Sequence, residues 1–162
     1  MERPNKDEYY LGIAKEVAKR STCMRRRFGA IIVNNDQVIS TGYVGAPRGT
    51  KNCIDIGFCP RQKANIPAGE RYELCRSVHA EQNAIIHAAR EQMIGGTLYL
   101  YGENMDGSIV EGKPCKMCTR VIINAGIKKV VTKSSRGVHT HNVDDWVKDE
   151  IIEYNKENIK GY

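Results

Sequence analysis

The chain has 162 residues, of which 41% are hydrophobic and 27% are charged, and this balance predicts one globular domain spanning residues 1–162. Such a composition excludes a disordered, collagen-like or coiled-coil protein as a description of the whole chain. No apolar run approaches the roughly 18 residues that a membrane helix needs, and the N-terminus contains no apolar signal core. We therefore expect a cytoplasmic protein with no membrane partner.

Lysine and arginine number 25 against 19 aspartate and glutamate residues, which gives a formal net charge of +6 at pH 7. This excess favours contact with an anion such as phosphate or nucleic acid. The chain also contains six cysteines, although disulfides rarely persist in the reducing cytoplasm. Six thiols in that compartment indicate metal binding or catalysis.

The first half of the chain predicts a helix followed by a hairpin. Residues 7–20 carry apolar side chains at helical spacing, with Asp7 as the candidate N-cap. Residues 28–33 and 37–43 are two β-rich runs on either side of a turn-forming Asn-Asn-Asp cluster. Residues 44–77 contain many glycines and prolines and no sustained periodicity. A loop of this length is usually functional or held in place by a bound group.

Helices alternate with strands in the second half of the chain. The sequence predicts helices over residues 79–90 and 114–125, strands over residues 97–101 and 128–132, and a C-terminal helix and tail over residues 142–162. This order indicates an α/β domain in which helices cover a mixed sheet. The hairpin supplies the antiparallel part of that sheet.

Cys115 and Cys118 lie three positions apart at a predicted helix start, so both sulfurs point the same way and can bind one ion. The positive end of the helix favours the thiolate form that binds zinc. His79, also at a predicted helix start, is the natural third ligand. Three protein ligands leave the fourth tetrahedral position for water, as in a catalytic zinc site. A C-x-x-C pair alone would fit redox chemistry equally well.

Two short motifs contain these residues: His79-Ala80-Glu81 and Pro114-Cys115-Lys116-Met117-Cys118. Together they match the H-x-E and P-C-x-x-C signature of zinc deaminases that act on nucleobases. The chain therefore resembles that class, in which the glutamate is the general acid and base and not a zinc ligand. The alternative is a buried histidine, a surface glutamate and a thioredoxin-like C-x-x-C, but that motif would be expected after a first strand.

Four longer segments narrow the resemblance: residues 21–33 (STCMRRRFGAIIV), 42–49 (GYVGAPRG), 75–86 (CRSVHAEQNAII) and 122–129 (IINAGIKK). They are similar to the deoxycytidylate (dCMP) deaminase family over about residues 7–132. The resemblance implies the cytidine deaminase fold, a three-layer α/β/α sandwich with a mixed sheet of about five strands. It also implies the hydrolysis of dCMP to dUMP and ammonia with a catalytic zinc ion, and Glu81 as the proton shuttle.

The resemblance also implies a set of substrate contacts. The family usually has asparagine at the position of Val44, whose side chain cannot form a hydrogen bond with the sugar. Either another residue holds the 3′-hydroxyl or the preferred substrate differs from dCMP. Arg26, with Arg25 second, is the candidate for the 5′-phosphate, because guanidinium groups pair bidentately with phosphate; a solvated basic turn before the first strand is the alternative for each. Tyr43 and Ala80 complete the expected substrate contacts.

Four cysteines remain: Cys23, Cys53, Cys59 and Cys75. Some members of the resembled family carry a second zinc ion on cysteines at the positions of Cys23 and Cys53. A structural zinc bound by all four thiolates would hold the long loop in place, because such an ion supplies folding free energy directly. The alternative is four ordinary free thiols.

Family analogy further implies a homo-oligomer, often a hexamer, and regulation by dCTP and dTTP. The pair His139 and His141 is expected in a solvated loop. Two competing functions stay open: a tRNA adenosine deaminase, and a non-catalytic, nucleic-acid-binding or DNA-uptake-associated member of the fold. The extra cysteines argue against the first, and Glu81 with an open zinc position argues against the second, so a nucleic-acid partner is not expected.

Overall fold

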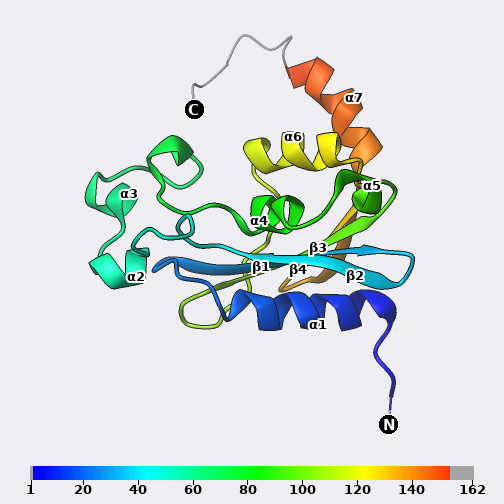
Figure 1. Ribbon diagram of the computed structural model, residues 1–162, viewed down its shortest axis with the longest axis horizontal. Helices are drawn as coiled ribbons and strands as arrows, with labels where there is room; N and C mark the ends of the chain where they lie inside the picture. Colours follow the sequence, from blue (N-terminus) through cyan, green and yellow to red (C-terminus); the bar gives the residue numbers. More distant parts are fainter. Residues whose placement is uncertain (1, 154–162) are drawn as a thin grey trace.

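Five strands form one mixed sheet between two layers of helices in the computed structural model, which describes residues 2–153 (Figure 1). The strand order is β2-β1-β3-β4-β5, with β3 and β4 parallel and the other neighbours antiparallel. This arrangement confirms the predicted α/β sandwich. The strands are β1 (Arg26–Asn34), β2 (Gln37–Tyr43), β3 (Thr97–Asn104), β4 (Lys129–Ser134) and β5 (Gly137–Asn142).

The predicted hairpin is formed by β1 and β2. Asn35 and Asp36 connect the strands with φ values of 49° and 59°, the left-handed conformation that tight hairpin turns require. The strand β1 begins earlier than expected, because Arg26 and Arg27 pair with the end of β3. The expectation that both arginines precede the first strand is therefore wrong. An ion pair of 3.4 Å between Arg27 and Glu103 supports the extension.

Helix α1 (Lys6–Ala18) covers one face of the sheet (Figure 1). Its N-cap is Asn5 and not Asp7, because the Asn5 side chain accepts a hydrogen bond of 2.9 Å from the Glu8 amide. The Glu8 carboxylate in turn accepts one from the Asn5 amide, which completes a capping box. Asp7 instead accepts a hydrogen bond of 2.9 Å from the Tyr99 hydroxyl and so ties the helix to β3.

The opposite face carries the remaining long helices and the site. The predicted helix over residues 79–90 is divided in two, and the predicted helix over residues 142–162 is described only as far as Glu153, so the rest of that prediction lies outside the described residues. No helix within residues 2–153 is long and apolar enough to cross a membrane. The helices are α4 (Ala80–Ile86), α5 (Arg90–Met93), α6 (Lys116–Ala125) and α7 (Val143–Glu153).

Helix α4 lies directly against the backbone of β2. A Cβ atom placed at Gly42 would be 2.2 Å from the Ala84 nitrogen and 2.4 Å from the Ala80 oxygen, so only glycine permits this approach. The Ser40 hydroxyl donates a hydrogen bond of 2.7 Å to the Ala84 carbonyl on the same helix. These contacts fix the position of α4 on the sheet.

Residues 44–77, predicted as a loop without regular structure, contain three single helical turns. They are too short to produce a hydrophobic period, which is why the sequence pattern did not reveal them. An isolated bridge between Gly45 and Val78 joins the two ends of the segment. The turns are α2 (Cys53–Ile56), α3 (Pro60–Lys63) and the 3-10 turn η1 (Tyr72–Leu74).

His139 and His141 lie in strand β5, at the edge of the sheet, and not in the solvated loop expected for them. The His139 ring contacts the Ser134 hydroxyl of β4 at 2.6 Å, and the His141 ring contacts the Thr132 hydroxyl at 3.3 Å. Pairing with β4 therefore places both histidines in the sheet although their sequence is polar.

Candidate active site

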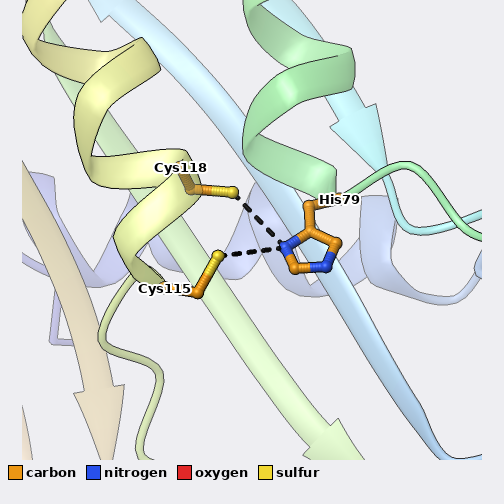
Figure 2. A group of neighbouring side chains, drawn as sticks. All are labelled: His79, Cys115 and Cys118. Atoms are coloured by element: carbon orange, nitrogen blue, oxygen red, sulfur yellow. Dashed lines mark hydrogen bonds between the residues drawn. The ribbon is translucent and has the colours of Figure 1, made fainter. Parts of the chain in front are cut away.

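Two helix N-termini position the predicted metal ligands. His79 is the N-cap of α4, and its backbone amide donates a hydrogen bond of 3.1 Å to the Gln82 side chain. Cys115 is the N-cap of α6, and Cys118 follows in the first turn of that helix. The two helices pack side by side on the sheet, so their N-terminal ends bring the three side chains together (Figures 1 and 2).

We call His79, Cys115 and Cys118 the helix-end cluster. The Nδ1 atom of His79 lies 3.4 Å from the Cys115 Sγ and 3.3 Å from the Cys118 Sγ, and Figure 2 shows both contacts. The three ligand atoms lie within 4.8 Å of one another, and among the described residues no other group of this kind is found. One imidazole nitrogen and two sulfurs at this spacing fit a zinc ion and leave one tetrahedral position open.

The two cysteines of the cluster shift each other's pKa in opposite directions. A hydrogen bond from Cys118 lowers the pKa of the Cys115 thiol to about 4, against the opposing effect of burial, and His79 lowers it further. The pKa of the Cys118 thiol is raised, mainly because it donates this hydrogen bond and also because it is buried. The pair therefore readily holds one negative charge, and a bound cation would stabilise the second thiolate.

Glu81 lies in the first turn of α4, two residues after His79, and is only 5% exposed. Burial raises the pKa of its carboxyl above the ordinary value, although the positive charge of His79 partly offsets this effect. The carboxyl also interacts electrostatically with both cysteines of the cluster. A buried carboxyl with a raised pKa beside a metal site is suited to take up and release a proton.

A cavity opens over the cluster between the sheet, α4 and residues 44–77. Five basic side chains reach its wall, against the two carboxylates of Glu81 and Glu111. Tyr43, predicted as a substrate contact, is 36% exposed and does not line this cavity. The other predicted substrate residues that line it are Arg25, Arg26, Val44 and Ala80.

Sequence reasoning missed Arg61 and Tyr72 on the cavity wall. The guanidinium carbon of Arg61 lies 4.7 Å from the centre of the Tyr72 ring. The Tyr72 ring in turn meets the His79 ring edge-on, with 5.1 Å between centroids and an interplanar angle of 85°. No local signal could have identified either residue, because both lie in a segment without periodicity whose path depends on tertiary contacts.

Cys23, Cys53, Cys59 and Cys75, which we call the loop cysteines, all line the same cavity. Burial raises the pKa of the Cys53 thiol, and the other three thiols contribute to the same shift. The four side chains are therefore close enough to interact electrostatically. Among the described residues, however, the loop cysteines do not form a second group of three or more ligand atoms placed to hold a metal ion, as the helix-end cluster does.

Comparison with known proteins agrees with this geometry. The family described as "Cytidine and deoxycytidylate deaminase zinc-binding region" matches residues 4–134. The deoxycytidylate deaminase of Mycobacterium phage D29 is 40% identical over 136 residues, which cover 81% of this chain and 96% of that protein. The deoxycytidylate deaminase of Schizosaccharomyces pombe is 39% identical over 139 residues, which cover 86% of this chain but only 40% of that longer protein.

A solved structure adds a comparison of the fold. The dCMP deaminase from the cyanophage S-TIM5, in complex with dCMP and dUMP, superposes with a TM-score of 0.60 at 26% sequence identity. The match covers 83% of this chain and 85% of that one. The family match includes the helix-end cluster and strands β1 to β4. The chain thus belongs to the cytidine and deoxycytidylate deaminase family.

Proposed function

We propose that this chain catalyses the hydrolytic deamination of dCMP to dUMP and ammonia. The observation that carries the proposal is the helix-end cluster with the buried carboxyl of Glu81 beside it, inside a cavity with a basic wall. The names of the relatives from Mycobacterium phage D29 and Schizosaccharomyces pombe support the choice of substrate, as do the dCMP and dUMP bound to the cyanophage protein.

The chain's own residues perform the proton transfers in this proposal. His79 Nδ1 and the two cysteine sulfurs would hold a zinc ion, which would supply the Lewis acidity that activates water for attack on C4 of the cytosine ring. Glu81 takes a proton from the attacking water and delivers it to ring N3. The C–O bond forms at C4 in this step. Glu81 then moves the remaining proton of the C4 hydroxyl to the amine, and the C–N bond breaks as ammonia leaves and a carbonyl forms at C4. The raised pKa of Glu81 suits both directions of transfer.

For the 5′-phosphate we propose Arg26 and, second, Arg25 at the rim of the cavity. Arg26 is exposed at the start of β1, so solvent weakens its contribution. Arg26→Gln should raise the Michaelis constant for dCMP by up to about tenfold and leave that for deoxycytidine almost unchanged. An equal effect on both substrates would reject this assignment. Val44 and Ala80 would line the sugar and base end of the cavity.

We further propose a second, structural zinc ion on the loop cysteines. Four thiols on one cavity wall supply the soft ligands that structural zinc sites use. The other three thiols contribute to the raised pKa of Cys53, which supports the proximity of the four side chains. Metal analysis of the purified protein tests the proposal, since two zinc ions per chain are expected. One zinc ion per chain would reject the second site.

The decisive experiment measures ammonia release from dCMP, deoxycytidine and a tRNA anticodon stem. Turnover of dCMP well above that of the other two supports the proposal. Preference for the tRNA stem would favour an adenosine deaminase. No turnover of any of the three by zinc-loaded protein would favour a non-catalytic member of the fold.

We also propose that the protein acts in the cytoplasm, where a reducing environment keeps its six cysteines out of disulfides and available to bind zinc. The homo-oligomer, with a hexamer as the family precedent, and the effectors dCTP and dTTP stay predictions from the family resemblance. Sedimentation of the protein with and without each nucleotide tests both.

A further inference from the structure

Arg61 is a buried cation on the cavity wall. Its side chain is 5% exposed, and it is the one arginine among residues 2–153 that is buried. Charged side chains are almost never fully buried unless an opposite charge or a ligand pairs with them. No ion pair in the described part of the chain includes Arg61. The Glu73 carboxylate interacts with it only at longer range, where the positive charge of Arg61 makes a minor contribution to the lowered pKa of Glu73.

The contacts of Arg61 hold the guanidinium in place without neutralising it. Its Nη2 atom donates hydrogen bonds of 2.9 Å to the Pro67 carbonyl and 2.6 Å to the Glu70 carbonyl, and its guanidinium lies against the face of Tyr72. Its Nε atom is buried and has no hydrogen-bond partner. Carbonyl oxygens and a ring face carry partial negative charge only. A fixed cation with unused hydrogen-bonding capacity therefore lines the cavity.

The other basic residues of the cavity differ from Arg61 in their exposure. Arg76 also donates a hydrogen bond to a carbonyl, that of Lys51 at 3.0 Å, but its side chain is exposed. Arg26 and Lys113 are exposed as well. Water stabilises these charges in the free protein, whereas Arg61 has lost most of that stabilisation. Among the basic residues of the cavity, Arg61 therefore gains the most from an anionic ligand.

We propose that Arg61 is a specificity-determining residue that binds the anionic phosphate of the nucleotide substrate. This inference rests on the proposed function and adds a buried anchor to the half-buried Arg25 and the exposed Arg26 at the rim. Tyr72 lies between the Arg61 guanidinium and the His79 ring. The Tyr72 ring therefore separates the phosphate bound at Arg61 from the metal ligand His79. A nucleotide likewise places its phosphate away from the reacting ring atom C4, because the sugar lies between them.

Arg61→Gln in the full zinc-loaded chain tests the inference. The value of kcat/KM for dCMP should fall by about 10- to 100-fold, as for the loss of a hydrogen bond to a charged group, while that for deoxycytidine should change by less than about threefold. Arg48→Gln is the matched control, because it removes an exposed arginine of residues 44–77 that does not line the cavity, and we expect less than about a threefold change for either substrate. Arg61→Lys should retain part of the preference for dCMP, since it keeps the charge but not the planar fork.

A purely structural role predicts a different result. If Arg61 serves only to hold the turn at Pro67 and Glu70, kcat/KM falls equally for dCMP and deoxycytidine, and the inference is overturned. Should the glutamine variant not fold by circular dichroism, the same ratio is measured for Arg61→Lys, where equal losses again overturn it. Calorimetric titration with dUMP and deoxyuridine gives a readout without turnover, in which only dUMP binding should weaken. A wild-type chain that turns over neither substrate contradicts the proposed function, whereas dUMP binding still tests Arg61.

Discussion

The helix-end cluster contributes His79 and Cys115 to the cavity that the loop cysteines also line, but the two groups are held in different ways. In the helix-end cluster, two packed helices bring three ligand atoms within 4.8 Å of one another. The loop cysteines come from a segment with single helical turns and from the residues before β1, and their sulfurs are not gathered to this extent. One site is therefore preorganised by the fold, whereas the other depends on what binds to it.

The cause of this difference lies in the supporting contacts. Helix α4 rests on β2 at Gly42 with no side chain between the two backbones. Residues 44–77 have an isolated bridge at their ends and helical turns of only three or four residues, which are too short to be stable alone. The rigid support of α4 suits a catalytic centre, because the rate of catalysis depends on the geometry of the metal ligands. A loop that the proposed second zinc ion would close suits a wall that must form around a substrate.

The largest effect is expected from a ligand of the helix-end cluster. Cys118→Ala removes one sulfur from a residue with no exposed surface, so the protein should lose the catalytic zinc and deaminate dCMP no faster than background. The fold should persist, because α6 packs on the sheet independently of the ion. Zinc content, circular dichroism and ammonia release measure these outcomes. Met117→Leu, a substitution between the two cysteines, is the control, and unchanged zinc in Cys118→Ala would contradict the assigned ligand set.

Glu81→Gln separates catalysis from metal binding at the same cluster. The amide cannot transfer a proton, so kcat should fall by about 10²- to 10⁴-fold while the zinc content remains that of the wild type. Steady-state rates and metal analysis on one preparation measure both quantities. Near-normal kcat in this variant would show that another group moves the proton.

Gly42→Ala tests whether the sheet positions the cluster. The added methyl group would lie 2.2 Å from a backbone atom of α4, so the helix must move or the strand must bend. We expect the free energy of unfolding to fall by about 1–3 kcal/mol, together with a loss of kcat, because His79 and Glu81 move with α4.

Gly12→Ala is the control for this substitution. Gly12 is exposed in α1 with no atom within 4 Å of the added Cβ, and alanine there should stabilise the helix by up to about 1 kcal/mol. Chemical denaturation and kinetics measure both variants, and a stable, fully active Gly42→Ala protein would disprove the role of this contact.

The same difference in support explains what the sequence predicts well. The helix-end cluster follows from local signals, since two cysteines three positions apart and a histidine at a helix start fix both ligand type and direction. The mixed sheet follows from the order of helices and strands. These features depend on short-range periodicity, which the sequence displays directly.

The parts that the sequence does not predict all depend on a distant partner. Arg26 joins β1 because β3 continues to Asn104, and the polar residues 137–142 become a strand because β4 pairs with them. Arg61 reaches the cavity because the turns of residues 44–77 fold against Tyr72 and the carbonyls that follow. In each case the side chain's position follows from tertiary contacts that its own neighbourhood in sequence does not encode.

The smallest effect on chemistry is expected from the loop cysteines. Cys53→Ser replaces a buried sulfur, so zinc should fall from two ions per chain to one while the helix-end cluster keeps its own. Because the loop loses its ligand-mediated closure, a protease should cut within residues 44–77 faster than in the wild type, and binding of dCMP should weaken more than kcat falls. Metal analysis, limited proteolysis with mapped cut sites, and steady-state kinetics measure the three quantities.

One outcome of the Cys53→Ser experiment would show that the loop cysteines are not a second zinc site. If wild type and variant both contain one zinc ion per chain and resist the protease equally, the loop cysteines are free thiols and residues 44–77 are held by backbone contacts and by Arg61 instead. A variant that loses all zinc would show that the helix-end cluster needs the loop. Only the loss of one zinc ion, with the catalytic centre intact, agrees with the proposed difference. In that case the fold positions the helix-end cluster, whereas zinc on the loop cysteines holds residues 44–77 in place.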